Sequence, residues 1–144
     1  VSLEKRGVAY IYYEGKFKHT DHFKTNGTKK DEGVMKNFSI ADAPAKDHFG
    51  YAFKTYIRIP KTGVYNFYLY SDDGSLLYID GKTVIDNNGS HSAARKGGKV
   101  ALEEGFHEVH LLYFEDYMGE KLKVKMSSRW MEEQEIPDEM LYLP

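Results

Sequence analysis

Two acidic residues stand side by side in the sequence Ser71-Asp72-Asp73-Gly74-Ser75. Asp and Gly are ordinary turn residues, so one interpretation is a tight turn with no further role. Adjacent carboxylates repel each other, however, and calcium, which takes about six to eight oxygen ligands, would relieve that repulsion. Side chains next to each other in an extended strand point to opposite sides, so both reach one ion only if the backbone bends sharply, as at a cis Asp72–Asp73 peptide. The motif therefore predicts either a structural turn or a calcium site.

The sequence contains no motif that indicates catalysis. The chain has no Cys, which excludes disulfides, thiolate zinc sites and cysteine nucleophiles. His107 and His110 resemble a fragment of a zinc-protease motif, but on a strand this spacing places them on opposite sides. No nucleophile elbow, phosphate-binding loop or dinucleotide fingerprint occurs, and 22 acidic residues are too many to nominate a general acid–base pair. We expect this domain not to be an enzyme by itself.

The composition of the chain limits the classes of partner that it can bind. The 144 residues carry a net charge of −2, so there is no basic surplus for nucleic acid, and we expect no nucleic-acid partner. No apolar run approaches the ~18 residues of a membrane-spanning helix, so we expect no membrane insertion. Aromatic residues are unusually frequent, with 12 Tyr, 8 Phe and one Trp. Tyrosine suits half-buried strands and also provides platforms on which sugars stack.

The elements that must position these residues are strands. Apolar residues alternate with polar ones over 49–59, 64–70 and 121–127, which predicts antiparallel strands. Pro60 to Gly63 and Asp80-Gly81 predict hairpin turns, and Glu103-Glu104-Gly105 predicts a third between strands at 100–102 and 106–115. Residues 16–46 show no sustained period and predict long loops with short strands, whereas a short helical turn is expected after Pro137. The fold class is therefore all-β, an antiparallel sandwich or barrel.

We expect one domain over residues 1–144, without a linker or internal repeat. The alternation places nine apolar side chains in its core: Phe53, Ile57, Phe67, Leu69, Leu77, Ile79, Leu111, Tyr113 and Val124. Because the chain begins at Val1 without Met, we expect a piece excised from a larger secreted protein.

Several motifs together resemble the protective-antigen fourteen (PA-fourteen) domain family over essentially the whole chain. The central signature is GVYNFYLYSDDGSLLYIDGK at 63–82. Flanking stretches that also fit are VAYIYYEG at 8–15, VIDNNGSH at 84–91, VALEEGFH at 100–107, LLYFE at 111–115 and the close at 136–142. The missing cysteines of fungal adhesin members favour the bacterial branch that is appended to glycosidases.

The resemblance implies a β-sandwich that binds glycans. In lectin members an adjacent Asp pair holds calcium through a cis peptide, and Asp72 and Asp73 match that pair. A second calcium loop falls at 115–119, where this chain has the acids Glu115 and Asp116 instead of the family's Asn. The implied metal ligands are therefore Asp72, Asp73, Glu115 and Asp116. For the sugar, Tyr117 is the best candidate for a stacking ring, with Tyr70 and His91 as weaker candidates beside Asp72 and Asp73.

Three functions remain open at this point. The first is a non-catalytic carbohydrate-binding module of a secreted bacterial glycoside hydrolase, with a glycan and the parent's catalytic domain as partners. The second is a calcium-dependent lectin domain of an adhesin, and the third is a spacer that shapes the parent's active-site mouth. All three predict a secreted, periplasmic or cell-surface location.

Overall fold

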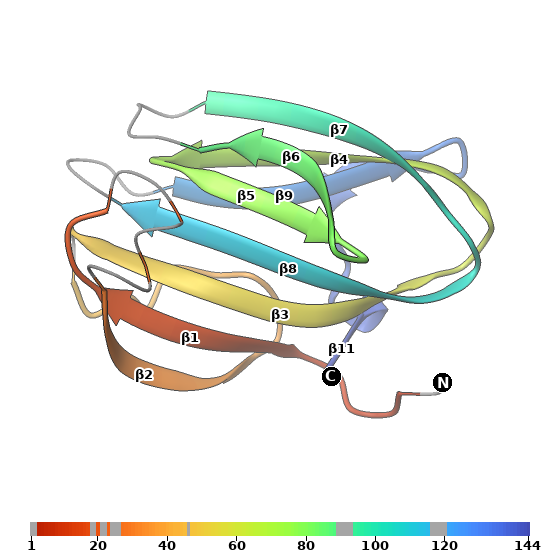
Figure 1. The fold of residues 1–144 in the computed structure, drawn as a ribbon. Helices are drawn as coiled ribbons and strands as arrows, with labels where there is room; N and C mark the ends of the chain where they lie inside the picture. The colour runs from red at the N-terminus through yellow and green to blue at the C-terminus, as the bar shows by residue number, and fades with distance from the viewer. Residues whose placement is uncertain are drawn as a thin grey trace.

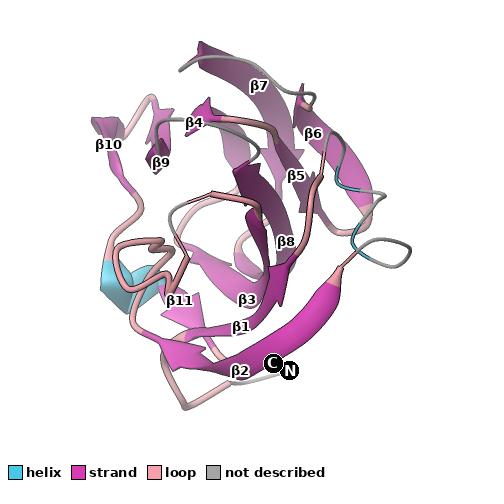
Figure 2. Cartoon of the chain, turned by 90° about the vertical axis from the view of Figure 1, so that its left-hand side faces the viewer, coloured by secondary structure: helices cyan, strands magenta, loops and turns pink. Residues whose placement is uncertain are grey.

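The computed structural model describes residues 3–17, 20, 23, 27–45, 47–88, 94–115 and 121–144. Two antiparallel sheets pack face to face as a sandwich, which confirms the predicted all-β class (Figures 1 and 2). The sheets do not close into a barrel, so that alternative is excluded. Its elements are β1 (Val8–Glu14), β2 (Thr28–Met35), β3 (Phe49–Ile59), β4 (Gly63–Asp72), β5 (Ser75–Ile79), β6 (Lys82–Asn87), β7 (Ala94–Leu102), β8 (Gly105–Glu115), β9 (Lys121–Ser128), β10 (Met131–Glu135), the 3-10 turn η2 (Asp138–Met140) and β11 (Leu141–Tyr142).

The larger sheet has the order β2-β1-β3-β8-β5-β6, with β11 also paired to β3, and the smaller sheet has the order β10-β9-β4-β7. The centre of the larger sheet is the long β3–β8 pair, which runs in register from Phe49 opposite Glu115 to Ile59 opposite Gly105. The Asp80-Gly81 hairpin forms as predicted, and both residues take the positive φ angles (54° and 77°) that such a two-residue turn requires.

The core lies between the two sheets and follows the alternation of the sequence. All nine side chains predicted to be inside are buried. Phe67 on β4 and Leu111 on β8, for example, are 1% and 0% exposed. Burying side chains of this size from both sheets supplies the main driving force for folding.

The segment 16–46 differs from its prediction because it contains the eight-residue strand β2. Most side chains of β2 are exposed, so apolar alternation cannot reveal it; the strand is held by backbone pairing with β1, from Val8 opposite Met35 to Glu14 opposite Thr28. For the same reason the exposed strand β10 gives no pattern in the sequence. The short helical turn after Pro137 is confirmed as η2.

The two ends of the chain lie side by side on the larger sheet (Figure 1). The Gly7 amide donates to the Leu141 carbonyl at 3.0 Å, and the Leu143 amide donates to the Lys5 carbonyl at 2.7 Å. The buried Thr55 hydroxyl bridges the carbonyl oxygens of Gly7 and Tyr142 at 2.8 and 2.9 Å. Within the described residues, no helix is long and apolar enough to cross a membrane.

Candidate functional site

Three carboxylates converge at one end of the sandwich. Asp72 ends β4, Asp73 follows it across a cis peptide bond, and Glu115 ends β8. Each offers a carboxylate oxygen, and these three oxygens lie within 4.8 Å of one another. The cluster is the one group of three or more potential metal-ligating side chains within the part of the chain that the structure describes.

A buried hydrogen-bond network holds the backbone of this turn. The Ser71 hydroxyl lies 2.9 Å from the Asp73 carbonyl and 2.7 Å from the Ser75 hydroxyl, and Asn87 donates its amide to Ser71 at 3.0 Å. Ser71, Ser75 and Asn87 are at most 2% exposed, so this network is protected from water. Buried polar groups that are fully bonded fix one arrangement of the chain. The turn is therefore built into the fold rather than left at the surface.

Strand β8 holds the turn from its other side. The Asp73 amide donates to the Phe114 carbonyl at 3.2 Å, and the Phe114 amide donates to the Gly74 carbonyl at 3.0 Å. The Tyr113 hydroxyl donates to the Asp72 carbonyl at 2.5 Å. These bonds place Glu115 directly beside the two aspartates.

Glu115 occupies an unfavourable position for an isolated carboxylate. Its side chain is buried, and neither carboxylate oxygen receives a hydrogen bond. Burial, followed by the adjacent Asp73 and Asp72 carboxyl groups, raises the pKa of Glu115 to about 9. An unpaired buried charge is strongly destabilising, so this arrangement needs either a proton or a cation beside Glu115.

The donor set fits a hard divalent cation. Carboxylate oxygens suit calcium or magnesium, whereas zinc sites are usually built from nitrogen and sulfur ligands. The two oxygens of Glu115 receive no donor from the rest of the described chain and adjoin the Asp73 carboxyl group, so a proton or a cation between the two groups would satisfy them. The residues present at this end therefore fit calcium, which could be held by Asp72, Asp73 and Glu115.

The structure thus brings together three of the four acids named as metal ligands. Asp116 lies outside the described residues, as do the sugar-site candidates Tyr117 and His91. Tyr70 is placed on the outer face of the smaller sheet, two residues before Asp72. The supporting roles of Ser71, Ser75, Asn87 and Tyr113 were not expected. Ser71 and Ser75 bond each other within the turn, whereas Asn87 and Tyr113 reach it from strands far apart in the sequence.

His107 and His110 do not converge, as the strand spacing predicted. His107 Nδ1 lies 2.5 Å from Asp80 Oδ2, whereas His110 lies on the outer face of the larger sheet. Burial and the nearby Lys54 charge lower the pKa of His110.

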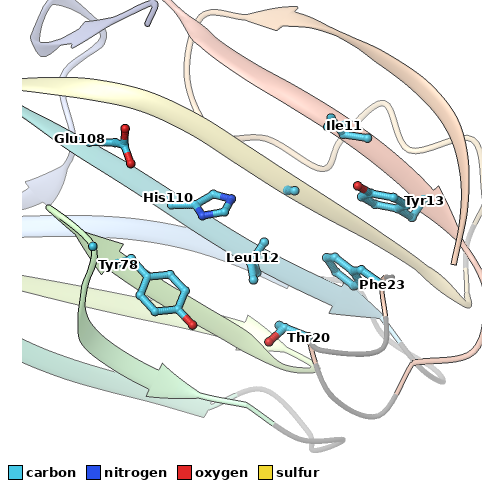
Figure 3. A pocket seen from close by; sticks show the side chains of 10 residues that line it. Ile11, Tyr13, Thr20, Phe23, Tyr78, Glu108, His110 and Leu112 are labelled. Atoms are coloured by element: carbon cyan, nitrogen blue, oxygen red, sulfur yellow. The ribbon is translucent and has the colours of Figure 1, made fainter. Parts of the chain in front are cut away.

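That outer face carries a groove of about 690 Å³ (Figure 3). The small Ala52 side chain leaves the depression, because its neighbours across the sheet are the larger Ile11 and Leu112. Tyr78 and His110 lie along one side of it, and Tyr13, Phe23 and Thr20 along the other. The groove is lined mainly by apolar and aromatic groups, and it is separate from the carboxylate cluster.

A family model described as the PA14 domain matches residues 4–142, so the chain belongs to the PA14 (PA-fourteen) domain family. The anti-sigma-I factor RsgI3 of Acetivibrio thermocellus is 32% identical over 79 residues, which is 54% of this chain and 12% of that protein. An anti-sigma factor domain-containing protein from Clostridium clariflavum has the same fold, with a TM-score of 0.81 and 22% identity over 100% of this chain and 50% of that one.

The PA14 sugar-binding domain of an RTX adhesin is similar as well, with a TM-score of 0.80 and 15% identity. The alignment covers 98% of this chain and 100% of that domain. This chain therefore corresponds to a whole domain of one relative but spans half or less of the two anti-sigma proteins.

Proposed function

We propose that this domain is a non-catalytic carbohydrate-binding module whose ligand is held through a calcium ion at Asp72, Asp73 and Glu115. The observation that carries the proposal is the Glu115 carboxylate, buried without a hydrogen-bond donor beside two further carboxylates. Membership of the PA14 family and the similarity to the sugar-binding domain of the RTX adhesin support sugar as the ligand class.

The chemistry of the site suits a polyhydroxylated ligand. Calcium accepts neutral oxygen ligands together with carboxylates, so a bound ion could take two neighbouring sugar hydroxyls in addition to its protein ligands. The protein's part is to hold three carboxylates in place through the buried network around Ser71. Tyr117, Tyr70 and His91 remain the predicted ring contacts, and Asp116 remains a predicted fourth metal ligand.

The host protein is a second part of the proposal. A secreted glycoside hydrolase stays a prediction from the sequence. The 32% identity to an anti-sigma-I factor favours a regulatory host instead, in which the domain would report the presence of a glycan outside the cell. The carbohydrate-binding role is common to both hosts, whereas a spacer would bind no sugar at all.

Calorimetry on the chelated protein tests the calcium part. We expect heat on adding calcium, and no comparable heat from Asp73→Asn. Asp80→Asn is the matched control, because it removes one carboxylate from a turn at the far end of β8 and Asn tolerates the positive φ of that position. No heat from the wild type at millimolar calcium would mean that the acidic pair is structural.

A glycan array probed with and without calcium tests the sugar part. We expect retention of at least one glycan class that is lost with chelator and in Asp73→Asn, and kept in Asp80→Asn. An array without binding in the presence of calcium would favour the spacer function.

A further inference from the structure

The outer face of the smaller sheet concentrates positive charge on a protein whose net charge is −2. Successive outward positions of β9 are lysines, and the neighbouring strands add tyrosines from β4 and cations from β7. We call this surface the cationic face, and it consists of Tyr68, Tyr70, Arg95, Lys99, Lys121, Lys123 and Lys125.

The register of the sheet makes these residues neighbours. Tyr70 lies between Arg95 on β7 and Lys123 on β9, and Tyr68 lies opposite Lys125. The ammonium groups of Lys121 and Lys125 are 5.9 and 5.6 Å from the centre of the Tyr70 ring. The tyrosine rings are half-buried, so the face presents aromatic surface surrounded by cations.

The five cations of this face outnumber the acids beside them, which are Glu133 and Glu135 of β10 and Asp72 at the end of β4. Arg95 pairs with Glu133 of the edge strand β10 at 2.5 Å. The four lysines of the cationic face form no ion pair with any described residue. Three of them, Lys121, Lys123 and Lys125, repeat every second residue of one strand, at intervals of about 6.6 Å. A row of like charges at this spacing attracts a ligand that carries repeated negative charge.

The cationic face adjoins the carboxylate cluster. Asp72, the last residue of β4, lies directly opposite Lys121 in the ladder, so a ligand held at the cluster would reach the lysine row by extending along β9. Tyrosine rings pack well against the C–H face of a sugar and leave its polar groups free.

We propose that the cationic face is an extended subsite for acidic polysaccharide, in which tyrosines 68 and 70 support sugar rings and the lysines pair with their carboxylates. This inference rests on the proposed carbohydrate-binding function and names its ligand class: a chain of uronic acids rather than a neutral glycan.

The test compares uronic-acid oligomers of mannuronate, galacturonate and glucuronate with the same oligomers after their carboxyl groups are reduced to alcohols. The sugar backbone is unchanged within each pair, so only the charge differs. We expect at least one acidic oligomer to bind about tenfold more tightly than its reduced partner, and this advantage to shrink as salt rises from about 0.05 to about 0.5 M.

Two triple variants locate the effect. K121Q/K123Q/K125Q should lose the preference for the acidic oligomer, each lysine contributing roughly twofold to fivefold. K29Q/K30Q/K82Q removes the same charge from exposed positions on the larger sheet and should keep the preference. Melting curves of both variants check that they fold.

The outcomes separate this inference from the proposed function. Equal binding of acidic and reduced oligomers, or an unchanged preference in K121Q/K123Q/K125Q, would overturn the acidic subsite even if calcium-dependent binding of the reduced oligomer survived. If the wild type bound no oligomer and also gave no heat when titrated with calcium, both proposals would be overturned. Equally tight retention of duplex DNA or of vesicles containing anionic lipid would also overturn the assignment to polysaccharide.

Discussion

The carboxylates at the two ends of strand β8 differ in whether the protein supplies them with hydrogen-bond donors. Near its start, Asp80 receives His107 Nδ1 at 2.5 Å and the Glu108 amide at 3.2 Å. At its end, Glu115 is buried with no donor and lies beside Asp72 and Asp73. The first carboxylate is balanced by the protein's own groups, whereas the second is balanced only when a proton or cation joins it.

This contrast separates a structural turn from a binding turn. Both turns lie next to β5 and both contain aspartate, so residue type alone does not distinguish them. What differs is whether the fold supplies the counter-charge. We therefore expect the Asp80 end to respond to pH through its histidine, and the Glu115 end to respond to added calcium.

The largest expected effect concerns the core that joins the two ends. Phe67 is 1% exposed, and Phe67→Ala should lower the free energy of unfolding by about 3–5 kcal/mol. Urea unfolding measures this, with Val34→Ala, at a position 59% exposed, as the control that stays near wild type. A loss below about 1 kcal/mol from Phe67→Ala would contradict its place in the core.

Calcium should stabilise one end only. An ion that binds the folded state alone adds about 2.7 kcal/mol at a hundredfold excess over its Kd. Melting curves after chelation should shift upward on adding calcium in the wild type and in Asp80→Asn, but not in Asp73→Asn. An equal shift in all three proteins would show that the ion binds elsewhere.

Relative to wild type, Glu115→Gln should stabilise the protein without calcium and destabilise it with calcium. Without calcium Glu115 must take up a proton on folding at pH 7, because its pKa is raised to about 9, whereas Gln needs none, so we expect a gain on the order of 1 kcal/mol in unfolding free energy. With calcium it removes a ligand, so the stabilisation by the ion should be smaller than in the wild type. A variant that is less stable than wild type in chelator would contradict the unpaired state of Glu115.

The smallest effect is the pH response of the Asp80 end. Burial acts to lower the pKa of His107, but the hydrogen bonds to Asp80 and the Glu103 carbonyl and the charges of both acids outweigh it, so its pKa is raised. A raised pKa in the folded state means that the contribution of His107 is complete below about pH 6.5, its unfolded pKa, and is lost as pH rises through the folded value.

The measurement is the difference in unfolding free energy between wild type and His107→Gln. This difference should favour the wild type at pH 6 and shrink by pH 9, in saturating calcium so that the other end is held constant. A difference that does not change with pH would show that the His107–Asp80 pair acts only by packing.

The sequence predicted which side chains of most strands point inward, and it also predicted the importance of the acidic pair, because both follow local rules. The period-2 alternation of apolar residues predicts that Phe67 and Val124 are buried, and Asp72-Asp73 is recognisable as an adjacent like-charged pair. Strand β2 could not be found in this way, because its exposed side chains carry no pattern and its pairing partner is distant. The hydrogen bond from Asn87 to Ser71 is likewise invisible in the sequence, since it depends on how β6 lies against the end of β4.

The hydrogen bonds that tie Gly7 to Leu141 and Lys5 to Leu143 have an architectural consequence. A polypeptide enters and leaves the domain at one point, so the domain can be spliced into a surface loop of another protein as easily as it can be joined at an end. Along β3, that point pairs at Ile57 and the acidic cluster lies near Phe49, roughly 25 Å away. Any such carrier would hold the domain by one tip and present the other tip outward.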